Sequence, residues 1–310
     1  MKHDMGRRCF LKTTGMAAAG MALCGLGNRK VFASKPVPKG APHAEQLGWL
    51  LGCQAYSFRK FSFFEAIEKT ASLGLTYIEA YPKQKIDKDK KVRMGVGLDK
   101  NQRREIKRRL DDAGVKLINY GCCPLVKDEA ESRKTFDFAK EMGVKTLVAE
   151  PPKAAFDTLE KLCDEYEINL AIHNHPHRPG SMYWDYRTVL EVCKDRSKRI
   201  GACCDTGHWM RSNIWPIEAI KALEGRIISL HLKDLDAFNK PKAHDVPWGT
   251  GKGHVHDVLN ELLRQKFKGF FAIEYERGGP KLLENMGKCV RYFDDSAVKL
   301  QIYDPPRVES

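Results

Sequence analysis

Asn169-Leu-Ala-Ile-His173 is the first of four apolar runs in the second half of the chain that end in a residue able to bind a metal. The other three are Ile200-Gly-Ala-Cys-Cys-Asp205, Ile227-Ile-Ser-Leu-His231 and Phe270-Phe-Ala-Ile-Glu274. Continuous apolar runs of this length are typical of parallel strands buried on both faces. In a closed barrel of such strands, the C-terminal ends all open at one mouth. We therefore expect two imidazoles and two carboxylates to meet there.

Strand-like and helix-like patterns alternate from residue 47 to residue 303. Eight strand and helix pairs in roughly 255 residues match the usual length of a (β/α)8 barrel, about 250 residues. The predicted fold class is therefore α/β, as a single (β/α)8 barrel. A doubly wound open sheet is the alternative, but no Gly-rich phosphate turn follows the first strand. The four earlier strands are predicted near Leu50–Tyr56, Tyr77–Ala80, Lys116–Tyr120 and Thr146–Glu150, and the helices near Ser62–Leu73, Lys100–Ala113, Glu129–Met142, Ala155–Tyr166, Tyr186–Lys194, Pro216–Leu223, Val255–Gln265 and Lys281–Val298.

The first 33 residues are predicted to be a twin-arginine signal peptide. Arg7-Arg8-Cys9-Phe10-Leu11-Lys12 matches the export pattern, and Val31-Phe32-Ala33 offers a small-residue cleavage site. This predicts a periplasmic protein, with a retained N-terminal anchor as an open alternative. In the mature chain we expect no membrane span, because no segment approaches about 18 consecutive apolar residues. Residues 34–46 are rich in proline and polar residues and are predicted to be a linker, and residues 304–310 a C-terminal tail.

Charge and cysteine content narrow the partners that we expect. The 310 residues carry a formal net charge of +13, and without residues 1–33 there remain 47 Lys and Arg against 39 Asp and Glu, a net charge of +8. Many of the bases lie in helical runs such as Gln102-Arg-Arg-Glu-Ile-Lys-Arg-Arg109, which is typical of a solvated helix face. We therefore expect no nucleic-acid partner. Cysteines such as Cys203 and Cys204 lie inside strand-like runs, which predicts buried thiols.

The metal ligands predicted from the four runs are His173, Asp205, His231 and Glu274. Two imidazoles and two carboxylates suit Mn²⁺, Zn²⁺, Co²⁺ or Fe²⁺ better than Ca²⁺. We expect one divalent ion, with Mn²⁺ in first place. Side chains alternate along a strand, so Glu276 shares a face with Glu274 and could replace or assist it. The sequence leaves that choice open.

The order of these motifs resembles the xylose-isomerase-like TIM barrel superfamily of sugar isomerases, epimerases and related lyases. The resemblance covers nearly all of residues 47–300 and implies one divalent metal at the ends of the fifth to eighth strands. Many relatives carry Glu where this chain has His173, and in the epimerases that Glu often moves protons. This departure disfavours a two-glutamate mechanism. The motifs are His173, Asp205-Thr-Gly-His208-Trp209, His231-Leu-Lys-Asp234, Trp248-Gly-Thr-Gly-Lys and Glu274.

The chemistry that the resemblance implies is abstraction of a proton next to a carbonyl. The His-Asn-His segment at 173–175 and the segments 205–209 and 243–251 also resemble barrels that cleave 3-keto-glycosides by elimination. There the C3 ketone acidifies the C2 proton, a base removes it, and the C1 oxygen leaves with its aglycone. We predict a carbon-oxygen lyase of this kind, with a sugar isomerase or epimerase on a free ketose or aldose as the alternative. The implied base is His175 or Glu150, and Lys233, Asp234 or His208 would bind the substrate or protonate the leaving group.

Aromatic side chains near the predicted mouth are candidates for stacking on a sugar ring. Two other functions remain open. An apurinic-site endonuclease of the same superfamily would need further His and Glu ligands for a multi-metal cluster, and a periplasmic sugar-binding protein would keep the barrel without catalysis. The sequence also leaves a homo-oligomer open. The stacking candidates are Tyr56, Trp184, Trp209 and Trp248.

Overall fold

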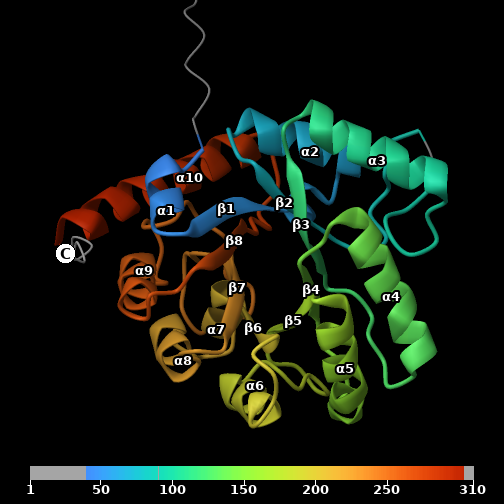
Figure 1. Ribbon diagram of the computed structural model, residues 1–310. Coiled ribbons are helices and arrows are strands. Elements are labelled where there is room, and N and C mark those ends of the chain that lie inside the picture. Colours follow the sequence, from blue (N-terminus) through green and yellow to red (C-terminus); the bar gives the residue numbers. More distant parts are fainter. Residues whose placement is uncertain (1–39, 90, 304–310) are drawn as a thin grey trace, which may run out of the picture. The chain divides into compact units, whose positions relative to one another are not determined.

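The computed structural model describes residues 40–89 and 91–303, and in this part eight parallel strands close into a barrel (Figure 1). Each strand pairs with the next in the sequence, and the first pairs with the last to close the sheet. The predicted (β/α)8 barrel is therefore confirmed. The strands are β1 (Trp49–Gln54), β2 (Tyr77–Ala80), β3 (Lys116–Gly121), β4 (Thr146–Ala149), β5 (Asn169–His173), β6 (Ile200–Asp205), β7 (Ile227–Leu232) and β8 (Gly269–Ile273).

Helices surround the barrel and cover the strands with their apolar faces (Figure 1). In α9 (Val255–Arg264), Val255, Val258, Leu259 and Leu262 are buried, and this three- and four-residue spacing places them on one helix face. The other outer helices are α2 (Phe63–Ser72), α3 (Lys100–Asp112), α4 (Glu129–Met142), α5 (Phe156–Tyr166), α6 (Tyr186–Cys193), α8 (Pro216–Ala222) and α10 (Leu282–Tyr303), and the 3-10 turns are η1 (Ala55–Phe58) and η2 (Lys153–Ala155).

Inside the barrel, small side chains from neighbouring strands form a layer. Val148 of β4, Ala171 of β5 and Cys203 of β6 are buried in a cluster separate from the main core. Residues two positions further along a strand point to the same face. His173 follows Ala171 and Asp205 follows Cys203 at this spacing, so both polar side chains lie above the layer, on the side of the barrel mouth.

Residues 42–46 form a short helix, α1 (Pro42–Gln46), beside α10 (Figure 1). Ala44 is fully buried, and His43 Nδ1 lies 2.7 Å from Oδ2 of Asp294 in α10. The prediction of a linker over residues 34–46 is therefore wrong for this part. A proline at the first helical position starts a helix as readily as it marks a loop, and the composition alone did not separate the two.

Three predicted segments lie outside the described residues: the signal peptide (1–33), the rest of the linker (34–39) and the tail (304–310). In the part that is described, no helix is both long enough and apolar enough to span a bilayer. The eight cysteines of this part are free thiols, and seven of them are buried.

Candidate metal centre

Four side chains at the C-terminal ends of β5 to β8 converge on one point. His173, Asp205, His231 and Glu274 are all buried, and one ligand atom from each lies within 4.8 Å of the others. The register of the strands explains part of this convergence, because Asp205 is the pairing partner of His231 and paired residues point to the same face. Two donor atoms of one ion with bonds near 2 Å lie up to about 4 Å apart, so separations of at most 4.8 Å are close to those of a single-ion site.

The hydrogen bonding of these side chains tests whether they fit a metal. One nitrogen or oxygen of each residue is buried and has no hydrogen-bond partner among the described residues: His173 Nε2, Asp205 Oδ2, His231 Nδ1 and Glu274 Oε2. A buried polar atom left without a partner costs about 1–3 kcal/mol. The four atoms also face one another, with His231 Nδ1 3.0 Å from Glu274 Oε2 and His173 Nε2 3.6 Å from Asp205 Oδ2, and a divalent ion bound by all four would satisfy them. We call these four residues the ligand group.

Lys233 places its ammonium group beside the ligand group. Its Nζ lies 2.8 Å from Asp205 Oδ2 and 3.1 Å from Glu274 Oε2, which are ion-pair distances without hydrogen-bond alignment. Its side chain runs along Gly207, where an added Cβ would lie 2.8 Å from Lys233 Cβ. Burial alone would lower the pKa of Lys233, but the carboxylates outweigh it and raise the pKa well above its usual value. Lys233 therefore offsets part of the charge of these carboxylates, and its predicted role toward the substrate stays a prediction.

Glu79, which was not predicted as a site residue, orients His231. Glu79 Oε1 lies 3.0 Å from His231 Nε2 and accepts a hydrogen bond from Gln54 Nε2 at 2.7 Å. A carboxylate can only accept, so Nε2 of His231 carries the hydrogen and Nδ1 is left for the metal. Glu79 is an acidic residue inside the short strand Tyr77–Ala80, which is a weak signal in the sequence, but its partner lies 152 positions away and only the structure shows it to be fully buried.

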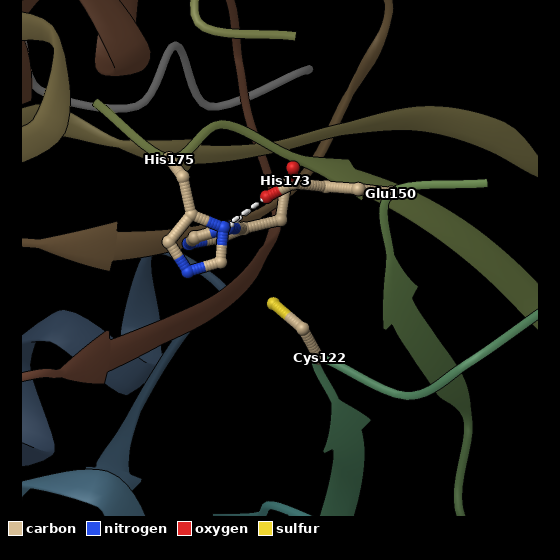
Figure 2. Close-up of side chains that lie close together, drawn as sticks. All are labelled: Cys122, Glu150, His173 and His175. Carbon is tan, nitrogen blue, oxygen red and sulfur yellow. Dashed lines mark hydrogen bonds and ion pairs between the residues drawn. The ribbon is translucent and has the colours of Figure 1, made fainter. Parts of the chain in front are cut away.

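Glu150 orients His173 in the way that Glu79 orients His231. Glu150 Oε1 lies 3.1 Å from His173 Nδ1, which leaves Nε2 of that imidazole facing the ligand group. The same oxygen contacts Nδ1 of His175 (Figure 2). Burial alone would raise the pKa of Glu150, but hydrogen bonds with both imidazoles outweigh it and lower the pKa to about 2. Glu150 is thus an ionised acceptor shared by two imidazoles, and of the two predicted bases His175 has the nitrogen that remains free.

Asp205 uses its two carboxylate oxygens differently. Oδ1 accepts a hydrogen bond from the backbone N–H of His208 at 2.7 Å and caps α7 (Thr206–Arg211), a short helix that starts directly after β6. Oδ2 belongs to the ligand group. Asn174 holds the backbone of Asp205 by donating to its carbonyl at 2.9 Å and accepting from its N–H at 2.8 Å. Helix α7 was not predicted, because its capping residue is also the last residue of the strand.

A cavity of about 380 Å³ opens above the ligand group. This volume lies in the range of small-molecule sites, about 300–1,000 Å³. Three members of the ligand group reach its wall, namely His173, His231 and Glu274. The wall also contains Tyr56, Tyr81, Cys122, His175, Arg178 and His208.

His208 is a neutral hydrogen-bond donor in this wall. Burial lowers the pKa of His208 well below its usual value. Arg211 Nη1 lies 3.0 Å from His208 Nδ1 and can only donate, so this closer contact places the imidazole hydrogen on Nε2, which lies 3.5 Å from both Asp205 Oδ2 and Lys233 Nζ. His208 thus lies between these two side chains and the pocket.

Glu276 lines the pocket next to Glu274 but has other partners. Its Oε2 lies 2.9 Å from Arg211 Nη1, and its Oε1 lies 3.2 Å from Lys233 Nζ. Glu274 Oε2 lies 3.0 Å from His231 Nδ1, and Glu274 belongs to the ligand group, whereas Glu276 does not. The choice between the two carboxylates thus falls on Glu274.

Asp234 was predicted to contact the substrate, and its position corrects this prediction. The carboxylate is buried and accepts hydrogen bonds from the backbone N–H groups of Gly249, Gly251 and Gly253 at 2.9, 2.9 and 2.8 Å. All of these bonds hold the loop over residues 249–253. Asp234 therefore organises a loop of the barrel mouth from below, without reaching the pocket.

The tryptophans predicted to stack on a sugar are packed elsewhere, which corrects that prediction. Trp209 and Trp248 are only 1% and 2% exposed, and Trp248 packs on Phe293 of α10 with ring centroids 5.8 Å apart. Trp184 packs on His177 at 4.4 Å. Tyr56, in contrast, is 38% exposed and lines the pocket. A hydrophobic pattern places aromatic residues near the mouth but does not tell which side of the strand they occupy.

Comparison with known proteins assigns the barrel to a family. The model of the xylose isomerase-like TIM barrel family matches residues 67–295. An uncharacterised protein from Parabacteroides distasonis ATCC 8503 has 30% sequence identity, with a TM-score of 0.63 over 79% of this chain and 98% of that chain. No curated protein matches the sequence.

Two more distant solved structures share the fold. A D-tagatose 3-epimerase-like protein has 17% identity, with a TM-score of 0.63 over 81% of this chain and 98% of its own. A xylose isomerase-like TIM barrel protein from Mycobacterium smegmatis, in complex with magnesium, has 12% identity, with a TM-score of 0.64 over 81% of this chain and 97% of its own. The chain therefore belongs to the xylose isomerase-like TIM barrel family.

Proposed function

We propose that this protein is a divalent-metal-dependent sugar enzyme that abstracts a proton next to a carbonyl, and that it is a 3-keto-glycoside lyase. The observation that carries the proposal is that His175, which contacts Glu150, lines the same pocket as three members of the ligand group. The family and the D-tagatose 3-epimerase-like neighbour support a sugar-modifying enzyme. The pocket supplies both of the groups that this chemistry needs, a cation site and a base.

The ligand group would hold the metal, with Mn²⁺ as the ion that we propose. A bound divalent ion supplies Lewis-acid stabilisation of the negative charge that develops on a carbonyl oxygen when the neighbouring proton is removed. The chain's own task is to position His173 and His231. Glu150 and Glu79 do so by accepting the hydrogen of the outer nitrogen of each imidazole.

His175 is the proposed base. Its Nδ1 contacts Glu150, so Nε2 is the nitrogen with a free lone pair. A neutral imidazole with a carboxylate on its other nitrogen is a common general base, because the carboxylate stabilises the imidazolium that forms. Of the two bases left open by the sequence, His175 is also the more exposed, with 37% of its side chain accessible against 23% for Glu150.

One base is enough for the elimination, because the proton that it removes is returned to the leaving group. His175 takes the proton from C2, the C1–O bond breaks, and a C1=C2 double bond forms. The imidazolium then returns its proton to the departing oxygen, so the products are an unsaturated 3-keto sugar and the free aglycone. His208 donates its Nε2–H to a substrate oxygen, and Tyr56 offers its ring to the sugar face.

A sugar isomerase or epimerase is the second candidate. Both candidates begin with the same proton abstraction and differ in the fate of the carbanion that it leaves. Epimerisation needs proton-moving groups on both faces of one carbon, and the chain has His173 in place of the second glutamate that its epimerase relatives often use. The proposed twin-arginine export also favours glycosides, since phosphorylated sugars are scarce outside the cytoplasm. We propose a periplasmic location on the same ground.

The test is incubation of the Mn²⁺-loaded protein with a 3-keto-glucoside that carries a chromogenic aglycone. We expect release of the aglycone together with the unsaturated sugar. An intact glycoside, with interconversion of free ketoses by the same preparation, would replace the lyase with the isomerase or epimerase. Three zinc ions per chain would point instead to the apurinic-site endonuclease.

Two variants and one control separate the roles in this assay. His231→Ala should lose both the metal and turnover, because it removes a member of the ligand group. His175→Asn should keep the metal and lose turnover, because it removes only the base. The exposed His256 of α9 serves as the matched control, and His256→Ala should behave like the unmodified protein.

A further inference from the structure

A second set of metal-ligating side chains lies next to the ligand group. Cys122, Glu150, His173 and His175 bring one ligand atom each to within 4.8 Å of one another. Cys122 follows β3, Glu150 follows β4, and the two imidazoles lie at and just beyond the end of β5. Figure 2 shows the thiol of Cys122 pointing toward the imidazoles, with Glu150 in contact with both rings. The proposed function gives Cys122 no task.

Cys122 differs from the other described cysteines in its surroundings. It is the one that is not fully buried, and its residue contributes to the wall of the pocket. The adjacent Cys123 is 5% exposed and packs in the main hydrophobic core. A thiol at the pocket wall can be reached by an ion that enters with the substrate, whereas the neighbouring thiol cannot.

His173 belongs to both sets, and each of its two ring nitrogens faces a different one of them. Nε2 belongs to the ligand group, while Nδ1 lies 3.1 Å from Glu150. A second ion therefore has three protein ligands of its own, Cys122, Glu150 and His175. Three protein ligands with one open position are typical of accessible zinc sites, and a thiolate selects Zn²⁺ and similar soft ions over Mn²⁺ or Mg²⁺.

We propose that Cys122, Glu150 and His175 form a second site for a thiophilic divalent ion such as Zn²⁺ or Cd²⁺, and that its occupation stops turnover. The inhibitory part rests on the proposed function, because Glu150 and His175 are the base and its partner. An ion that binds the lone pairs of both leaves no base for the C2 proton. The ligand group remains free to hold its own ion.

The test uses Cd²⁺ as the probe and two variants of adjacent cysteines, Cys122→Ala and Cys123→Ala. Titration of the metal-free protein should show two Cd²⁺ per chain in the unmodified protein and in Cys123→Ala. One of the two should give the near-ultraviolet absorption of a thiolate bound to cadmium. Cys122→Ala should bind one Cd²⁺ fewer and lose this absorption. Circular dichroism and urea unfolding would show that both variants fold.

Three results would overturn the site: binding of one Cd²⁺ only, a second Cd²⁺ without thiolate absorption, or absorption that persists in Cys122→Ala. Inhibition is tested separately on the Mn²⁺-loaded protein with a 3-keto-glucoside. One added equivalent of Cd²⁺ should reduce turnover at least tenfold, and Cys122→Ala should lose this response relative to its own rate. Full turnover with the second site occupied would refute the inhibition. Absence of turnover before Cd²⁺ is added would refute the proposed function instead, and leave the cadmium stoichiometry as the test of the site.

Discussion

Glu79 of β2 and His231 of β7 meet inside the barrel, with Glu79 Oε1 3.0 Å from His231 Nε2. The two residues are 152 positions apart in the sequence. Gln54 of β1 and Asn119 of β3 donate hydrogen bonds to the same carboxylate, at 2.7 and 3.3 Å. A buried network from one side of the barrel thus fixes the orientation of a metal ligand on the other side.

Glu79→Gln should weaken metal binding by about 10–100-fold, the usual effect of losing a carboxylate that orients a ligating imidazole. The carboxamide can donate to Nε2 as well as accept, so it no longer fixes the hydrogen there. Competition with a chelator measures the affinity. Glu68→Gln, an exposed change in α2, is the control. Equal affinities in the two variants would show that Glu79 does not orient the ligand.

Asp205→Asn and Asp205→Ala should separate the two tasks of this carboxylate. Both variants lose the ligand oxygen, so both should lose the metal. Only Asn keeps an oxygen that can cap α7, so Asp205→Ala should be less stable than Asp205→Asn by about 1 kcal/mol. Urea unfolding of the two metal-free variants gives this difference directly. Equal stabilities would mean that the cap contributes nothing.

Asp234→Ala should destabilise the barrel while the ligand group stays intact. The change removes the acceptor of three backbone N–H groups in residues 249–253, of which that of Gly253 is buried, and a buried donor left without a partner costs about 1–3 kcal/mol. We expect a loss on the order of 3 kcal/mol in urea unfolding with unchanged metal content. Asp257→Ala, an exposed acidic position in α9, controls for the lost charge. Reduced metal content in a folded variant would contradict the loop role.

Asp245 should make the protein less stable as the pH rises. Burial raises the pKa of Asp245 from 3.8 to about 7, although Lys233 and Arg211 oppose the shift. Between these values the unfolded chain has released a proton that the folded protein still holds, so the free energy of unfolding falls with increasing pH. Asp245→Asn removes this dependence. The stability gained by the variant should therefore grow from pH 4 to about pH 7 and then level off.

Urea unfolding at a series of pH values, with the same metal loading for both proteins, measures this difference. A gap between variant and unmodified protein that stays constant across the range would show that Asp245 is already ionised in the folded state at low pH.

The barrel itself was predictable, because each strand is an apolar run and each ligand stands at the end of one. His173, Asp205 and His231 are the last or next-to-last residues of their strands. Residues whose role depends on a partner far away in the sequence could not be predicted. Glu79 and Asp234 act through hydrogen bonds to segments that only the closed sheet brings near. Trp209 and Trp248 were predicted at the pocket but lie in the core, since a pattern of apolar residues does not distinguish a pocket wall from the core.

The position of Lys233 has a consequence for how the protein acquires its ion. Because an ammonium group already stands between Asp205 and Glu274, it offsets one of the two negative charges at this point before any ion binds. An arriving ion is then attracted by less net negative charge than two unopposed carboxylates would offer, and this reduction affects every divalent ion.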